Sequence, residues 1–148
     1  MKFNEVQVDM ELEPLVKPPI EKVQLVKYAG ASGDFNLIHT DDETARQSGL
    51  PGVIAHGMLI MAFLGQMAAQ IAGNDGFVRG LQVRFAGMVM PGDTVTCRAK
   101  IIRKDEQQKT ADLQISAETE PGKTTTFGSA TIQFFDQNKE RGEQNEKR

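Results

Sequence analysis

The chain has very little cysteine, because Cys97 is the only one among its 148 residues. A single cysteine cannot form a disulfide within the chain, and it excludes a structural metal cluster built from several thiolates. A chain without disulfides suits a reducing compartment. We therefore expect a cytoplasmic protein.

An excess of positive charge is also absent. The 17 Lys and Arg residues are outnumbered by 20 Asp and Glu residues, which gives a net charge of -3 and a pI near 5.4. Without a basic field the chain offers no general surface for a nucleic acid or an anionic membrane. The first fifteen residues lack the continuous apolar segment of a secretory signal, so we expect no export.

Residues 57–73 lack charge altogether, and their only polar side chains are Gln66 and Gln70. A membrane span needs about 20 apolar residues, whereas this stretch is shorter and includes three glycines. We therefore expect a buried central helix and no membrane segment. A helix that is apolar on nearly every side must be covered by other elements, most economically by a curved sheet.

Four stretches rich in Val, Ile, Thr and Phe follow this helix, and their apolar and polar residues often alternate. Turn-forming or charged residues separate them. The pattern predicts an antiparallel meander of strands at residues 77–90, 93–104, 109–120 and 124–135. Helix and strands together indicate an α+β fold in one domain over residues 1–135. The charged residues 136–148 have no apolar side chain and predict a disordered tail.

Shorter elements are expected before the central helix. Residues 12–17 contain Pro14 and precede Pro18 and Pro19, which predicts a short edge strand, and residues 20–31 have the apolar spacing of an amphipathic helix. A structured loop follows over residues 32–41, rich in Gly, Asn, Asp and Thr. Asp41 or Asp42 then caps a short helix.

The loop carries a carboxylate and an imidazole, Asp34 and His39, with Asn36 between them. On an irregular loop, two side chains five residues apart can point at one small volume. Histidine accepts and gives protons at neutral pH, and a neighbouring carboxylate can orient its ring or bind the same water. Taken alone, these residues more often form an Asx-turn at Asp34 and a capping or packing histidine than a catalytic pair.

His56 and Gly57 give a second signal at the start of the expected helix. The first turn of a helix offers N–H groups without intrahelical partners and the positive end of the helix dipole. Such a donor stabilises a thioester oxygen that becomes an enolate, and removing one donor typically costs about 3 kcal/mol. The alternative is that Gly57 only permits tight packing while His56 caps the helix.

Together, the segments GDFNLIHTDDETA and GLPGVIAHGML resemble the signature of the MaoC-like (R)-specific enoyl-CoA hydratases and the related (3R)-hydroxyacyl-ACP dehydratases. The segment RFAGMVMPGDTV follows in the order of that family, and the resemblance extends from about residue 20 to residue 135. It implies a hot-dog fold, in which an antiparallel sheet wraps one long helix. It also implies a dimer in which acyl chains enter near the subunit interface.

The resemblance implies the reversible addition of water to a trans-2-enoyl thioester in fatty-acid metabolism, giving the (R)-3-hydroxyacyl thioester. By position, Asp34 and His39 would be the catalytic pair, and the Gly57 amide would hold the thioester oxygen. No metal or other cofactor is implied, because the acyl-CoA or acyl-ACP substrate brings its own phosphopantetheine arm.

The remaining site residues follow from the same comparison. Asn36 would fix the loop, and together with His56 and Met58 it makes up the expected substrate-binding group. The family usually has proline where this chain has Leu37, although the spacing between acid and histidine is kept.

Two alternatives share the hot-dog architecture. Acyl-CoA thioesterases of this fold commonly place an acidic residue on or beside the central helix, and residues 57–73 contain none. A heterodimeric acyl-binding dehydratase, in which one chain carries the acid–histidine pair, is the other alternative, and this chain would be the one that carries it. We therefore expect a homodimer or a heterodimer with another hot-dog chain.

Overall fold

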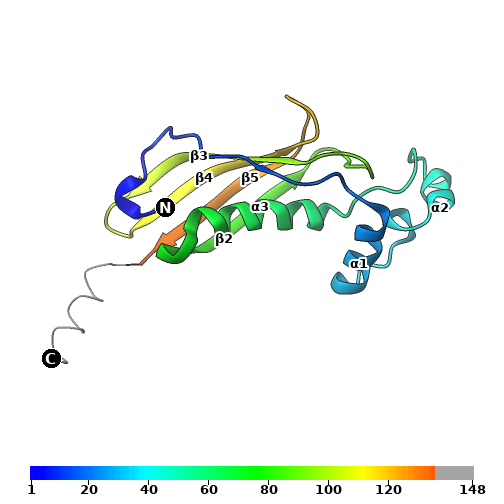
Figure 1. Ribbon diagram of the computed structural model, residues 1–148, viewed down its shortest axis with the longest axis horizontal. Helices are drawn as coiled ribbons and strands as arrows, with labels where there is room; N and C mark the ends of the chain where they lie inside the picture. Colours follow the sequence, from blue (N-terminus) through cyan, green and yellow to red (C-terminus); the bar gives the residue numbers. More distant parts are fainter. Residues whose placement is uncertain (136–148) are drawn as a thin grey trace.

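A single long helix packed on a curled antiparallel sheet dominates the computed structural model, which describes residues 1–135 (Figure 1). This helix, α3, spans Gly57–Ala72 and confirms the expected central helix. The tail predicted at residues 136–148 lies outside the described residues.

The sheet has five strands in the order β1-β3-β4-β5-β2, and every pair of neighbours is antiparallel. The expected edge strand within residues 12–17 is confirmed as β1, which pairs with β3. The strands are β1 (Leu15–Val16), β2 (Gly76–Phe85), β3 (Thr96–Asp105), β4 (Thr110–Glu118) and β5 (Thr124–Phe134).

The predicted meander is correct for β3, β4 and β5 and wrong for β2. Instead of pairing with β3, β2 lies at the far edge beside β5. It also ends at Phe85 instead of reaching residue 90, because the regular ladder with β5 stops there: the Ala86 and Gly87 amides both donate to the single Thr125 carbonyl. The segment of ten residues between β2 and β3 is long enough to carry the chain to the opposite side of the sheet.

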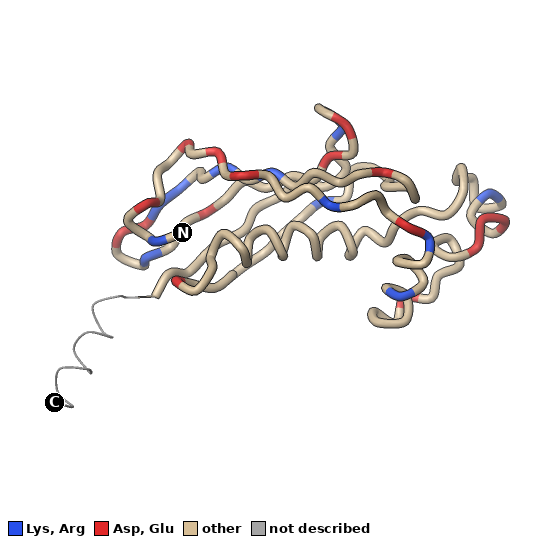
Figure 2. Tube along the Cα trace, viewed as in Figure 1, with Lys and Arg blue, Asp and Glu red and all other residues tan. Residues whose placement is uncertain are grey.

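The core lies between α3 and the inner face of the sheet. In β4, Leu113, Ile115 and Ala117 are buried, while the alternate residue Gln114 is exposed, as a strand with one covered face requires. The expectation that other elements cover nearly every side of α3 is wrong for the single chain, because Met58, Gln66 and Gln70 are exposed and only one side of the helix is covered. Figure 2 shows that no charged residue lies anywhere on this helix.

Short helices gather at the end of the molecule where α3 begins (Figure 1). They are α1 (Lys22–Ser32), the 3-10 turn η2 (Leu37–His39) and α2 (Asp42–Gln47). Two further 3-10 turns, η1 (Phe3–Glu5) and η3 (Gly73–Asp75), lie at the other end. Over residues 1–135, none of the helices has the length and apolar character needed to cross a bilayer.

The two aspartates proposed as caps take different roles. Asp41 is the N-cap of α2, where its side chain accepts from the Thr44 amide at 2.8 Å. Asp42 forms an ion pair with Lys22 of α1 and accepts from the Val53 amide at 3.0 Å. Asp42 therefore joins α1, α2 and the segment that leads into α3.

Candidate active site

The loop that carries the acid begins where α1 ends. Gly33 adopts φ 75° there, a left-handed conformation that glycine reaches without steric cost, and its amide donates to the Ala29 carbonyl at 2.9 Å. The chain turns sharply out of the helix at this residue. Asp34 follows directly, with its side chain half exposed.

Two local turns hold the loop in shape. The Asp34 carboxylate accepts from the Asn36 amide, and the Asn36 side chain accepts from the Ile38 amide, both at 3.2 Å. The second contact makes Asn36 the N-cap of η2. The Asx-turn considered as an alternative is therefore present, and it leaves the second oxygen of Asp34, Oδ2, directed at His39.

His39 is buried, and a backbone contact fixes the tautomer of its neutral ring. Its Nδ1 lies 2.7 Å from the Ile54 carbonyl oxygen, which can only accept, so Nδ1 carries the proton. Nε2 then offers its lone pair toward Asp34, whose Oδ2 lies 3.8 Å away. This gap is too long for a direct hydrogen bond and suits one bridging water.

His56 lies beneath His39 rather than capping α3 with its side chain. It occupies the N-cap position, but its side chain makes no capping hydrogen bond. Its ring stacks on that of His39, with centroids 3.8 Å apart and planes 23° apart. Only 1% of His56 is exposed. The structure thus brings three of the predicted site residues, Asp34, His39 and His56, into contact.

Gly57 and Met58 begin α3 beside this cluster. A Cβ atom on Gly57 would lie 3.0 Å from Cδ1 of Phe85, so the Phe85 ring packs directly over the glycine. Tight packing and a free N–H at a helix start are therefore both features of Gly57. The Met58 side chain is exposed on the first turn.

Two neighbours of the site are absent from the sequence-based prediction. Phe85, at the end of β2, covers Gly57, and the Tyr28 ring of α1 meets the edge of His56 at 4.9 Å. Phe85 lies inside the RFAGMVMPGDTV segment, which was the available signal for it. Tyr28 gave no signal beyond its place in an amphipathic helix.

Asp34, His39 and His56 together have the residue types and spacing of a metal site, since one ligand atom from each lies within 4.8 Å of the others. A metal ion binds imidazole nitrogens at about 2.0–2.1 Å, with their lone pairs converging on it. Stacked rings instead hold their lone pairs in two nearly parallel planes, which disfavours convergence on one ion. This arrangement suits a hydrogen-bonded catalytic pair better than a metal centre, and the expectation of no metal stays a prediction.

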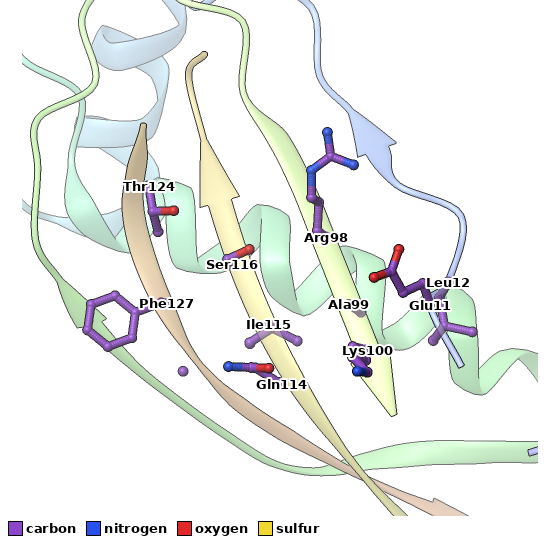
Figure 3. A pocket seen from close by; sticks show the side chains of 11 residues that line it. Glu11, Leu12, Arg98, Ala99, Lys100, Gln114, Ile115, Ser116, Thr124 and Phe127 are labelled. Atoms are coloured by element: carbon purple, nitrogen blue, oxygen red, sulfur yellow. The ribbon is translucent and has the colours of Figure 1, made fainter. Parts of the chain in front are cut away.

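Other reactive or hollow places lie apart from this cluster. A hollow of about 560 Å³ lies on the outer face of the sheet, lined by Arg98, Lys100, Gln114 and Phe127 among others (Figure 3). Its charges are compensated, because Arg98 pairs with Glu118 and Lys100 with Asp9. The thiol of Cys97 is fully buried, and this burial raises its pKa to about 11, so it is a poor nucleophile.

Comparisons with known proteins agree with this fold. The (R)-specific enoyl-CoA hydratase of Aeromonas caviae is 28% identical over 112 residues, which cover 75% of this chain and 84% of that protein. Its structure matches with a TM-score of 0.78 at 26% identity, over 88% of this chain and 98% of that chain. The unliganded R-hydratase PhaJ1 from Pseudomonas aeruginosa has the same fold, with a TM-score of 0.82 at 24% identity over 92% and 86% of the two chains.

A second group of relatives consists of much larger proteins. The fatty acid synthase subunit beta of Aspergillus oryzae is 40% identical over 75 residues, which are 49% of this chain and 4% of that protein. The chain thus spans only a small part of this relative. The fold is the hot-dog fold of these R-hydratases. The MaoC like domain matches residues 4–122, and the chain belongs to the MaoC-like dehydratase family.

Proposed function

We propose that this protein is a hydro-lyase that adds water reversibly to trans-2-enoyl thioesters and gives (R)-3-hydroxyacyl thioesters. One observation carries the proposal: Oδ2 of Asp34 lies 3.8 Å from Nε2 of His39, beside the N-terminus of α3 at Gly57. The alternative carriers are coenzyme A and acyl carrier protein, and the similarity to an (R)-specific enoyl-CoA hydratase favours coenzyme A.

The acid and the imidazole act on one water molecule held between them. The water oxygen forms a bond to C3 of the enoyl group while its proton passes to the Asp34–His39 pair. The C2–C3 double bond becomes single, and the pair returns a proton to C2. Because Nδ1 of His39 is held by the Ile54 carbonyl, the free Nε2 is the ring atom that takes part.

Charge on the thioester oxygen is stabilised by the start of α3. As C3 is attacked, electrons move toward the thioester and give its oxygen enolate character. The Gly57 N–H has no intrahelical partner, and it lies at the positive end of a 16-residue helix. A preorganised donor of this kind lowers the free energy of the transition state by about 3 kcal/mol.

The apolar acyl group must be shielded from water, and one chain alone leaves the apolar side chains around the site exposed. Phe35, Met58 and Phe85, in or next to the site, are all more than half exposed. Over residues 1–135, the outer edge of β2 is unpaired as well, because within that part of the chain this ten-residue strand pairs with β5 alone. An unpaired strand edge is a template for pairing with another chain. A dimer formed along β2 and the exposed face of α3 would cover these side chains, with a second copy of this chain as the first candidate and another hot-dog chain as the alternative.

The proposal is tested by following the conjugated enoyl absorbance of crotonyl-CoA, with chiral analysis of the product. We expect (R)-3-hydroxybutyryl-CoA and no release of free thiol. Free thiol would instead support the thioesterase alternative. Wild-type protein that turns over neither crotonyl-CoA nor longer enoyl thioesters on either carrier contradicts the proposal.

Asp34→Asn and His39→Ala should each lower kcat at least about 100-fold, because each removes a proton-transfer group. Asp34→Asn should leave thermal stability unchanged, because asparagine can keep the turn hydrogen bond from the Asn36 amide. The matched control is Asp9→Asn, the same chemical change at an exposed residue that pairs with Lys100. Near-wild-type turnover in either site variant would place the chemistry elsewhere.

A further inference from the structure

His56 contacts both members of the proposed catalytic pair. Its Nε2 lies 3.2 Å from the backbone carbonyl oxygen of Asp34, and its ring stacks at 3.8 Å on the imidazole of His39. The Tyr28 ring packs edge-on against the His56 ring, with the two ring centroids 4.9 Å apart. With 1% of the residue exposed, the ring has almost no surface with which to contact a substrate.

The hydrogen bond to Asp34 fixes the tautomer of neutral His56. A carbonyl oxygen can only accept, so Nε2 carries the proton and donates. Nδ1 is left with a lone pair. It is buried, and among residues 1–135 it has no hydrogen-bond partner.

An unpartnered buried acceptor weakens a fold, because the group loses its water without gaining a partner. An aromatic ring without nitrogen would fill the same space between His39 and Tyr28 without this cost. Burial also lowers the pKa of His56, and the nearby His39 acts in the same direction, so the ring stays neutral at pH 7. Stability alone therefore does not account for histidine at this position.

We propose that His56 is a positioning residue that holds the Asp34 loop and the His39 ring in register. This inference rests on the proposed hydratase function. The hydrogen bond from His56 Nε2 fixes the position of the Asp34 backbone, and stacking on His56 fixes the orientation of the His39 ring. Together they fix the 3.8 Å separation of Asp34 Oδ2 and His39 Nε2, which one attacking water can bridge by a hydrogen bond to each atom. Small displacements of reacting groups cost large factors in rate, about 100-fold for 1 Å.

Three variants separate the two contacts. His56→Phe keeps the stack and removes the donor, His56→Gln keeps a donor near the Nε2 position and removes the stack, and His56→Leu removes both. We expect kcat to fall about 100-fold in His56→Leu and about 10-fold in each of the other two. KM should stay within about 2-fold of wild type, because no substrate contact is lost.

The midpoint of thermal unfolding distinguishes a positioning role of His56 from a purely structural one. His56→Phe should have a midpoint equal to or above that of wild type, because the unpartnered Nδ1 is gone, and yet a lower kcat. The control for lost packing is Ile132→Val, at a fully buried residue on β5, which should lower the midpoint and leave kcat unchanged. A His56→Leu protein that is folded at the assay temperature and keeps kcat within about 2-fold overturns the inference. A raised KM with unchanged kcat also overturns it, because it would make His56 a substrate contact.

Nuclear magnetic resonance gives a readout that does not depend on activity. The chain has only two histidines, so ¹⁵N spectra of the imidazole nitrogens report His39 and His56 without overlap. We expect the Nδ1–H form for His39 and the Nε2–H form for His56 in the wild type, and altered His39 ring-nitrogen shifts in His56→Leu. If the wild type hydrates no enoyl thioester, the proposed function fails separately. Altered His39 signals then still support positioning, and unchanged signals overturn it.

Discussion

His56 makes the stability of the fold depend on pH near neutrality. Burial depresses its pKa below the usual 6.5 in the folded protein, whereas in the unfolded chain it titrates near that value. As the pH falls through 6.5, the unfolded chain binds a proton that the folded protein resists, so stability is lost on the acid side and is complete above it.

Chemical denaturation at pH 8 and at pH 5.5 measures this effect, and His56→Phe is the control in which the difference between the two pH values should shrink. The carboxylates titrate in a lower window. The pKa of Asp42 is lowered mainly by its hydrogen bond to Lys22, and that of Glu118 mainly by its hydrogen bond to Arg98. Both contribute stability that is lost only below about pH 4.5. If the free energy of unfolding changes equally in wild type and in His56→Phe between pH 8 and pH 5.5, the assignment of this pH dependence to His56 is contradicted.

The residues of the site were only partly open to sequence reasoning. Asp34 and His39 belong to one short loop, so their proximity could be predicted from spacing. The stack of His39 on His56 could not, because the two rings come from separate segments 17 residues apart, with no period relating them. The tautomer of His39 depends on the carbonyl of Ile54, and a backbone group leaves no signature in a sequence.

At the scale of the elements, one substitution at the start of η2 should stabilise the fold. Leu37 is its first residue, and the preceding Asn36 is extended at φ -60° and ψ 122°, as a residue before proline must be. Proline at a first helical position has the required φ and gives up an amide that has no intrahelical partner. Leu37→Pro should therefore raise the free energy of unfolding by about 0.5–1 kcal/mol.

Thermal unfolding checks this change, with Ile38→Pro as the contrast. The Ile38 amide donates to the Asn36 side chain, so proline there should destabilise the loop. A lower midpoint for Leu37→Pro than for wild type would show that the first residue of η2 does not have the backbone angles of a proline.

Gly128 of β5 allows the close contact between β2 and β5. A Cβ atom at Gly128 would lie 1.9 Å from the Gln82 carbonyl oxygen, a distance that only backbone movement can relieve. Gly128→Ala should cost at least about 3 kcal/mol in the free energy of unfolding. Gly80→Ala on the neighbouring β2 is the matched control, because nothing lies within 4 Å of its added methyl group. Urea denaturation with equal midpoints for the two variants would contradict this account.

The strands themselves were predictable, whereas their order was not. Alternation of apolar and polar residues in β4, such as Leu113 beside Gln114, shows which face of a strand is covered. It does not show which strand lies next to it. The place of β2 beside β5 depends on the connection after Phe85, whose amides bond to Thr125, and no periodicity encodes that contact.

At the scale of the whole molecule, the proposed dimer makes a prediction for the free edge of β2. Phe77 lies on this strand and is 49% exposed, so a charge there should disrupt pairing with a second copy. Light scattering after size exclusion should give twice the 16.3 kDa of one chain for wild type and a lower mass for Phe77→Glu.

The matched control is Ile102→Glu on β3, which is equally exposed and does not lie next to β2 in the sheet. It should keep the wild-type mass. A monomeric wild type that is fully active, or a Phe77→Glu protein that keeps the dimer mass, would contradict assembly along β2.

The length of α3 separates the site from the turn between β3 and β4. Asp34, His39 and Gly57 lie at the beginning of the helix, whereas Lys104 and Lys109, which flank the turn, contact Phe3 near the other end (Figure 1). Sixteen helical residues span about 24 Å. A fluorophore, an affinity handle or a surface anchor attached at this turn would thus leave the proposed catalytic end free, which makes the turn a suitable point for immobilising the protein.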